Sequence, residues 1–388
     1  MIIAGIVSEY NPFHAGHLYH INETKKKTGA DYIVACMSGA FTQRGLFAFM
    51  DKFDRVKMAL SAGVDAVLEL PAVCAVRPAE WFARGGVSVL DGVGADILSF
   101  GSENADEESI HRLFSILQDE PESLKEAIRR GLSKGKTLAR ARGEALENLF
   151  PGLSGMPNLS LGLEYMASVK ALGSKMKTCV IERNSPYHSD TLVSGLSASE
   201  IRRAVETGNA SWAMEKLPES VRPIFENALA GGISKPEKTD SLILHAVRSM
   251  TKQALSELPD ASEGLSDRLY SKAQEASDTE ELISLVKCKR YTRARITRVI
   301  AGALLSLPKK APEEAPYLRL LGFRKDAAPL IREMSVRSEG KLISDPSLLE
   351  KNPAFQIEKR ATDLWGLSAE NAKYRKAGRE RKEKFIVI

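Results

Sequence analysis

The stretch of sequence that decides the fold is IIAGIVSEYNPFHAGHLYH, residues 2–20. Residues 2–7 form a short apolar run typical of a buried strand, and a polar loop and a helix-like pattern follow directly. His14 and His17 therefore lie at a helix entrance, where unsatisfied backbone N–H groups and the positive end of the helix dipole attract phosphate. Gly16 has no Cβ, so a phosphate or a planar base can approach the backbone closely.

Two imidazoles three residues apart point toward the same helix entrance. Their rings can donate hydrogen bonds to phosphate oxygens and stabilise the charge that grows as an α–β phosphoanhydride breaks. Two other interpretations stay open: two polar caps on an exposed loop, or two ligands of a metal ion. The strand–loop–helix context favours nucleotide binding. No metal site is predicted, because no third ligand is clustered with the histidines and the four cysteines stand far apart.

The alternation of apolar runs and helical patterns continues beyond this stretch. Continuous apolar runs separated by helices are typical of parallel strands that are buried on both faces. The runs lie at 2–7, 32–37, 66–70, 96–100 and 177–182, and helix-like stretches lie near 17–28, 51–62 and 79–91. They predict an α/β fold with a doubly wound parallel sheet, whose ligand lies outside the carboxyl ends of the strands.

The second half of the chain has a different hydrophobic pattern. Beyond about residue 210 the pattern is overwhelmingly helical, with a short strand-like run at 317–323. We therefore expect a sheet domain over 1–209 and a mostly helical domain over 210–388. No run of about 18 apolar residues occurs, so we expect no membrane span. A secretion signal has a basic segment followed by a long apolar segment, and the start of this sequence shows neither. We therefore expect a cytoplasmic protein without a secretion signal.

Basic residues are segregated along the chain. Lys and Arg total 55 against 50 Asp and Glu, yet residues 287–298 carry six cations and no acid, and residues 371–388 carry seven cations and two acids. Neighbouring cations repel one another, which predicts surfaces that face a polyanion. The predicted RNA contacts in the first run are Lys289, Arg290, Arg293 and Arg295, with Tyr291 as a ring on which a base stacks. The alternatives are a solvated helix face for the run and a disordered terminus for the tail.

Several segments together resemble a known family. His14-Ala15-Gly16-His17 resembles the His-x-Gly-His signature of the nucleotidyltransferase superfamily, which includes the class I aminoacyl-tRNA synthetases. From residue 2 to about residue 300 the chain resembles one family within it, the bacterial tRNA(Met) cytidine acetate ligases. The segments that carry this resemblance are EYNPFH (9–14), SGAFTQRG (38–45), ELP (69–71), FGSE (100–103), PN (157–158), SASEIR (197–202) and KRYT (289–292).

The resemblance implies a nucleotidyltransferase-like, ATP-binding catalytic domain over 1–209 and an RNA-binding domain over 210–388. The implied enzyme is a ligase that activates acetate with ATP as acetyl-adenylate and transfers acetyl to N4 of the wobble cytidine of elongator tRNA(Met). Mg²⁺ is expected to accompany the triphosphate, although no Asp/Glu cluster identifies its ligands. Acetate and tRNA are the implied partners, and we expect no obligate protein partner. Two rivals stay open: a small-molecule nucleotidyltransferase that makes a nucleotide cofactor, and a non-catalytic RNA-binding protein.

The resemblance also assigns site residues. It implies His14 and His17 as the reactive pair, within an ATP loop of Val7, Ser8, Glu9, Tyr10, Asn11, Pro12, Phe13, His14, Ala15, Gly16, His17 and His20. The later nucleotide contacts are Gly101, where a missing side chain leaves room, Asn158, Arg183 and Asn184. Asn158 has an alternative role as a helix cap. Ser199 and Arg202 resemble a second phosphate-binding element, with Ser199 capping a helix and Arg202 neutralising the triphosphate.

Overall fold

The computed structural model describes residues 1–388 except 104–105, 136–137, 184–196 and 384. At its centre is an eight-stranded sheet in the order β5-β4-β1-β2-β3-β6-β7, with β8 paired to β6. The strands predicted for the first half of the chain are β1 (Ile3–Ser8), β2 (Tyr32–Ser38), β3 (Ala66–Leu70), β4 (Ile97–Ser102) and β5 (Lys177–Glu182). These five strands run parallel, which confirms the predicted fold class.

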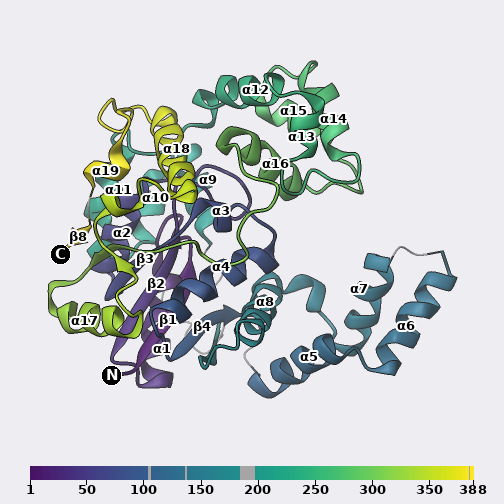
Figure 1. The fold of residues 1–388 in the computed structure, drawn as a ribbon, viewed down its shortest axis with the longest axis horizontal. Coiled ribbons are helices and arrows are strands. Elements are labelled where there is room, and N and C mark those ends of the chain that lie inside the picture. The colour runs from purple at the N-terminus through teal and green to yellow at the C-terminus, as the bar shows by residue number, and fades with distance from the viewer. Residues whose placement is uncertain (104–105, 136–137, 184–196, 384) are drawn as a thin grey trace.

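Helices cover both faces of the sheet (Figure 1). One face carries α1 (Ala15–Thr28), α2 (Lys52–Ser61), α9 (Ala198–Glu206), α10 (Ala210–Glu215) and α11 (Arg222–Leu229), whose apolar side chains share one core. The other face carries α3 (Ala72–Ala75), α4 (Ala79–Gly92) and α8 (Pro157–Ala171). α4 approaches β1 closely because Gly86 has no Cβ, and an added Cβ would lie 2.7 Å from Val7 Cγ1.

The strand order fixes where a ligand can bind. β1 lies between β2 and β4. The chain moves outward from β1 through β2 to β3 and then crosses to β4 on the opposite side of β1. Such a reversal of strand order is where doubly wound sheets bind their ligands, outside the carboxyl ends of the strands. The loop that follows β1, with both signature histidines, lies at this point.

Residues 210–388 do not form one separate helical body. The helices α12 (Asp240–Arg248), α13 (Lys252–Ser256), α14 (Leu265–Ala273), α15 (Thr279–Val286) and α16 (Arg293–Leu305) form a cluster at the upper right of Figure 1. The chain then returns to the sheet. β6 (Leu318–Phe323), the strand expected near 317–323, pairs antiparallel with β3 and covers an edge that would otherwise be open.

The segment from 328 to 388 completes the sheet domain. It forms α17 (Ala328–Arg337), β7 (Leu342–Ile343), α18 (Pro353–Ser368), α19 (Arg379–Lys382) and β8 (Ile386–Val387). The predicted boundary at 209/210 therefore does not coincide with a division of the fold, because α10, α11 and three later strands belong to the sheet domain. Helical periodicity along the chain does not reveal which helices pack on a distant sheet, and that explains the difference.

The basic tail is anchored rather than free. Arg379 makes a bidentate ion pair with Asp51 at the start of α2, with Nη1···Oδ2 and Nη2···Oδ1 distances of 2.6 and 3.1 Å. Glu380 is 1% exposed. Two of the tail's charges are thus part of the core, and the alternative of a disordered terminus is wrong for the part that the structure describes.

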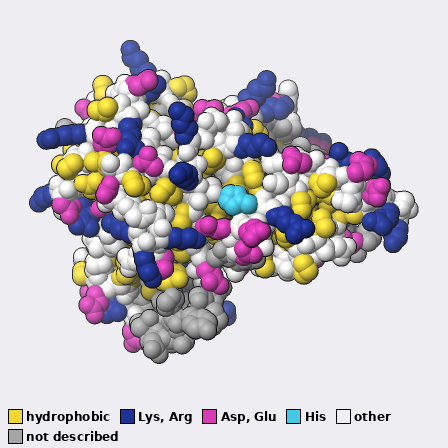
Figure 2. Space-filling view, turned by 90° about the horizontal axis from the view of Figure 1, so that it is seen from below, with side chains coloured by type: hydrophobic (Ala, Val, Ile, Leu, Met, Phe, Trp, Pro, Cys, Tyr) yellow, Lys and Arg dark blue, Asp and Glu magenta, His cyan; other side chains and the backbone are white. Residues whose placement is uncertain are grey.

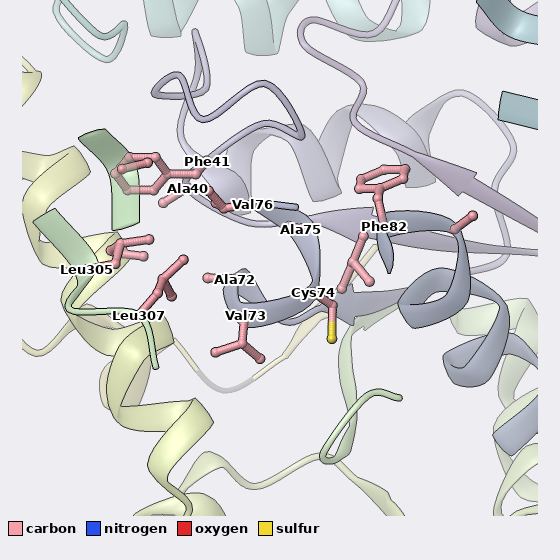
Figure 3. Close-up of a cluster of buried hydrophobic side chains, with 14 of the residues drawn as sticks. Ala40, Phe41, Ala72, Val73, Cys74, Ala75, Val76, Phe82, Leu305 and Leu307 are labelled. Atoms are coloured by element: carbon pink, nitrogen blue, oxygen red, sulfur yellow. The ribbon is translucent and has the colours of Figure 1, made fainter. Parts of the chain in front are cut away.

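An apolar contact joins the helical cluster to the sheet domain (Figure 3). Leu305 and Leu307, at and beyond the end of α16, pack near Phe41 of the β2–α2 loop and near Val73 of α3. All four side chains are buried. This contact fixes the orientation of α16 relative to the loop that follows β2.

An arm of three helices projects at the lower right of Figure 1, below the helical cluster. It consists of α5 (Glu107–Asp119), α6 (Glu122–Ser133) and α7 (Leu138–Leu149). Figure 2 shows that acidic and basic side chains are interspersed over the arm and the underside of the sheet domain. No helix in the described part of the chain is both long and apolar enough to cross a bilayer.

Candidate active site

The loop after β1 is held by its two histidines. His14 is the N-cap of α1, and its Nδ1 accepts a hydrogen bond from the backbone N–H of Gly16 (3.0 Å). In return, Nδ1 of His17 accepts a hydrogen bond from the backbone N–H of His14 (3.2 Å). This is a capping box in which imidazoles replace the usual Ser and Glu. It brings the two rings together, with centroids 3.8 Å apart.

These hydrogen bonds fix the protonation state of both rings. Because each Nδ1 accepts a hydrogen bond from a backbone N–H, a neutral ring must carry its proton on Nε2. Burial, helped by the charge of Arg183, lowers the pKa of His14 to about 3. Burial also holds the pKa of His17 well below its usual value, assisted by His14 and Arg183. Both residues are therefore neutral Nε2–H donors near pH 7.

His20 lies one turn further along α1. Its Nε2 is 2.9 Å from Oγ of Ser99, which is 2.7 Å from Oγ1 of Thr24. Burial and then Arg183 lower its pKa to about 4. The structure thus ties His20 to β4. Its predicted contact with ATP remains a prediction.

Lowering the pH is expected to destabilise the protein through these histidines. Unfolded histidines bind protons near pH 6.5, whereas folded His14 and His20 remain neutral down to about 3 and about 4. The unfolded state then binds more protons, so the free energy of unfolding falls as the pH falls below 6.5. Urea unfolding at about pH 7 and about pH 5 measures this change. Between the two pH values the free energy of unfolding should fall less for His20→Asn than for wild type. Equal losses would contradict this account.

Arg183 and Gly101 meet at the ends of β5 and β4. A Cβ on Gly101 would lie 2.9 Å from Cγ and Cδ of Arg183. The room that the missing side chain leaves is thus occupied by the stem of Arg183. Its guanidinium lies close enough to the three histidines to lower their pKa values. Asn184, the other nucleotide contact predicted in this segment, lies outside the described residues.

Asn158 is held by the carboxylate of Glu103, which was not among the predicted site residues. Its side-chain amide donates to Oε1 of Glu103. The backbone N–H groups of Asn158 and Leu159 donate to Oε1 and Oε2 of the same residue, at 3.1 and 3.0 Å. Burial alone would raise the pKa of Glu103, but these hydrogen bonds outweigh it and hold the pKa below its usual value. Glu103, not Asn158, caps the start of α8, so the cap alternative for Asn158 is wrong.

The start of α9 reaches the signature loop. Nη1 of Arg202 donates to the carbonyl oxygen of Asn11 (2.6 Å), and Nη2 donates to Oγ of Ser199 (3.0 Å). The cap of α9 is Ser197, in a capping box with Glu200, so the expectation that Ser199 caps this helix is wrong. The Ser-x-x-Glu spacing at 197–200 is typical of a capping box and could have identified Ser197 as the cap.

A buried arginine of α2 joins the ends of β1 and β2. Nη1 of Arg55 donates to the carbonyl oxygens of Glu9 (2.6 Å) and Ser38 (3.0 Å), and Nη2 donates to that of Gly39. Sequence reasoning missed this residue, because a single arginine in a helix gives no signal of where its side chain lies. Asn11 extends the same network, since its Oδ1 accepts a hydrogen bond from the backbone N–H of Phe49 (2.6 Å).

The cation run at 287–298 is only partly available to a ligand. Tyr291 is 6% exposed, and its hydroxyl donates to the carbonyl oxygen of Glu263 (2.5 Å). A base cannot stack on a ring buried in this way, so that expectation is wrong. Arg293 pairs with Glu280, and Arg295 pairs with Glu263. Lys289 and Arg290 are exposed.

One group of three carboxylates in the described part of the chain has the proximity of metal ligands: Glu69, Glu358 and Glu380. The ammonium nitrogen of Lys52 already lies among them, 2.6, 3.0 and 2.5 Å from their oxygens. All four side chains are almost completely buried. The ammonium group of Lys52 therefore already occupies the position that a metal ion would take, and we assign no metal to these carboxylates.

Comparisons with known proteins agree with this geometry. The model of the HIGH Nucleotidyl Transferase family matches residues 1–380. The chain is 35% identical to the tRNA(Met) cytidine acetate ligase of Acetivibrio thermocellus over the full length of both chains. It is 36% identical to that of Caldanaerobacter subterraneus, with 95% of each chain covered. The crystal structure of Thermotoga maritima TmcAL bound with alpha-thio ATP superimposes over both full chains with a TM-score of 0.88 and 29% identity.

Proposed function

Because this chain belongs to the HIGH nucleotidyltransferase family and, within it, to the tRNA(Met) cytidine acetate ligases, we propose that it modifies the wobble cytidine of elongator tRNA(Met). ATP activates acetate as acetyl-adenylate with release of pyrophosphate, and acetyl then passes to N4 of the cytidine. The observation that carries this proposal is the pair of neutral Nε2–H donors, His14 and His17, at the reversal of strand order. A tRNA substrate implies a cytoplasmic location.

The activation step needs donors for charge that grows on phosphate. In the proposed complex ATP lies over the carboxyl ends of β1 and β4, and an acetate oxygen attacks the α-phosphorus in line as pyrophosphate leaves. His14 and His17 donate from Nε2 to phosphate oxygens, which stabilises the transition state without a covalent intermediate. Arg183 and Arg202 add positive charge on either side of this loop. The other contacts proposed for ATP are the residues of the loop itself, Asn158 and the backbone of Gly101.

Mg²⁺ does not fit a protein-built site at this edge of the sheet. Among the described residues, Glu103 accepts three hydrogen bonds at the start of α8, and Asp51 pairs with Arg379. The remaining carboxylate next to the loop, Glu9, faces three arginines. Triphosphate oxygens are the usual ligands of a nucleotide-bound Mg²⁺. We therefore assign no protein residue to the ion and derive no step through it.

The proposed RNA surface begins at Lys289 and Arg290. Changing both to Ala is expected to make the dependence of log Kd for tRNA on log salt concentration shallower by about 1–2 units, since each phosphate contact contributes about 0.7–0.9. Arg293→Ala is the matched control, because Arg293 is engaged by Glu280 and should change the slope less. Binding titrations at several salt concentrations measure these slopes. An unchanged slope in the double variant would place the RNA surface elsewhere.

A direct test of the function measures pyrophosphate release with and without acetate and tRNA, together with N4-acetylcytidine in the RNA. We expect acetate-dependent release, and acetylated tRNA only when all substrates are present. Nucleotide transfer to a small molecule, without RNA acetylation, would instead support a cofactor-forming nucleotidyltransferase. RNA binding without any ATP turnover would support a non-catalytic protein.

A further inference from the structure

The signature loop is surrounded by groups that donate hydrogen bonds. His14 and His17 are neutral, and their Nδ1 atoms are occupied by backbone N–H groups. Arg183 and Arg202 are cations that release no proton and accept none near neutral pH. Among the described side chains that border this loop, these four can stabilise negative charge but cannot act as a base.

Glu9 differs from all of them. It directly follows β1, and its Oε1 accepts a hydrogen bond from the backbone N–H of Gln43 (2.6 Å). Among the described residues nothing donates a hydrogen bond to its other oxygen, Oε2, and the side chain is only half-buried. Glu103, the other carboxylate near the β1–β4 junction, has both oxygens engaged at the start of α8.

Three arginines and one phenol, on four different elements, face this carboxyl. Arg55 of α2, Arg202 of α9 and Arg44 of the β2–α2 loop favour its ionised form. Tyr165 of α8 is also close, since the charge of Glu9 helps to raise the pKa of its phenol after burial. Burial is the largest influence on Glu9 itself and raises its pKa above the usual 4.5. The carboxylate is thus a stronger base than an exposed one.

Glu9 is also linked by contacts to the helix that follows the proposed RNA surface. The β2–α2 loop, residues 39–51, holds Glu9 through Gln43. The next residue of that loop, Arg44, accepts at its carbonyl oxygen a hydrogen bond from Oγ1 of Thr297 (2.5 Å) on α16. α16 begins at Arg293, shortly after the exposed Lys289 and Arg290. A short chain of contacts therefore connects the carboxylate to the proposed RNA surface.

Acyl transfer to cytidine needs a proton acceptor at this place. When the N4 amino group attacks the acetyl carbon, the adduct carries a positive charge on nitrogen until a proton leaves. A positioned carboxylate with a raised pKa accelerates such a proton transfer, typically by about 10²–10⁴-fold. The Nε2–H groups of His14 and His17 are instead suited to stabilise the negative charge on the AMP that leaves.

We propose that Glu9 is the general base of acetyl transfer, and this inference rests on the proposed function. The N4–carbon bond forms as N4 attacks the acetyl carbonyl carbon. The bond between that carbon and the phosphate oxygen of AMP then breaks, and AMP leaves with the electron pair. The N4 proton passes to Oε2 of Glu9 and from there to solvent.

The test bypasses activation by supplying synthetic acetyl-adenylate to protein and tRNA in a single turnover. Glu9→Gln keeps an acceptor for the N–H of Gln43 but cannot take a proton. We expect the transfer rate constant to fall about 10²–10⁴-fold, with partial recovery in Glu9→Asp. Glu23→Gln on α1, where the carboxylate pairs with Lys26, makes the same chemical change outside the site and is the matched control.

The pH profile separates a chemical role from a structural one. In wild type the transfer rate should rise with pH as the carboxyl ionises and then level off, and Glu9→Gln should lack this rise. Transfer by Glu9→Gln at the wild-type rate, or with the wild-type pH profile, would overturn the proposal. Failure of the wild-type protein to acetylate tRNA from acetyl-adenylate would contradict the proposed function instead.

Discussion

Replacing His17 with alanine is expected to slow acetate-dependent adenylate formation about a hundredfold, the usual effect of removing one transition-state donor. The imidazole provides a neutral Nε2–H beside that of His14, and nothing in the described part of the loop can replace it. ATP–pyrophosphate exchange with acetate measures the change. A rate close to that of wild type would remove His17 from the mechanism.

A structural effect of the same substitution has to be separated from the chemical one. His17 is half-buried against Tyr10 and Phe13, and its Nδ1 accepts the hydrogen bond from the N–H of His14. Losing this cap should cost about 1 kcal/mol of stability. His17→Gln restores an acceptor for His14, because glutamine is a common residue at this position of a capping box. If His17→Gln recovers stability but not exchange, the loss is chemical.

Replacing Lys52 with methionine is expected to lower the free energy of unfolding by about 3–5 kcal/mol. Lys52 Nζ lies within 3.0 Å of carboxylate oxygens of Glu69, Glu358 and Glu380. Arg319 is the other cation of this buried cluster. Without the ammonium group, three carboxylates would share one arginine in a site closed to water. Urea unfolding measures the loss.

Lys57→Met is the matched control on the same helix. Lys57 is 45% exposed and pairs with Asp54 at 3.0 Å, and such a surface pair contributes at most about 1 kcal/mol. The difference in the free energy of unfolding between Lys52→Met and wild type should also become smaller at low pH. The Glu358 carboxyl already has a pKa raised to about 7, by burial and then by Glu69, and protonation removes part of the repulsion. Equal stability of the two variants would show that the cluster does not hold the fold together.

This cluster explains why the C-terminal tail is part of the sheet domain. Glu69 comes from β3, Lys52 from α2, Glu358 from α18 and Glu380 from α19. Elements more than 300 residues apart thus meet around one ammonium group. Charged residues in a basic tail resemble a flexible RNA-binding terminus in the sequence, yet Arg379 and Glu380 have partners inside the protein.

The sequence was sufficient for the features that depend on short stretches. The five parallel strands and the helices between them follow from apolar runs and helical periodicity, and these patterns reflect burial on both faces of a sheet. The placement of His14 and His17 at a helix start follows from the polar loop between strand and helix. The family could also be identified, because several short characteristic segments occur between residues 9 and 292.

Features that depend on contacts between distant segments were decided only by the tertiary structure. Nothing local distinguishes Tyr291, which is buried, from Arg290, which is exposed, or reveals that Glu280 neutralises Arg293. The pairing of β6 with β3 and the carboxylates around Lys52 likewise join residues that lie far apart in the chain. Sequence patterns report whether a residue is compatible with burial, whereas its partners depend on how the chain closes on itself. The sequence alone therefore determined the strand–loop–helix that places two histidines at the sheet edge, and the tertiary structure decided which charges pair within the protein.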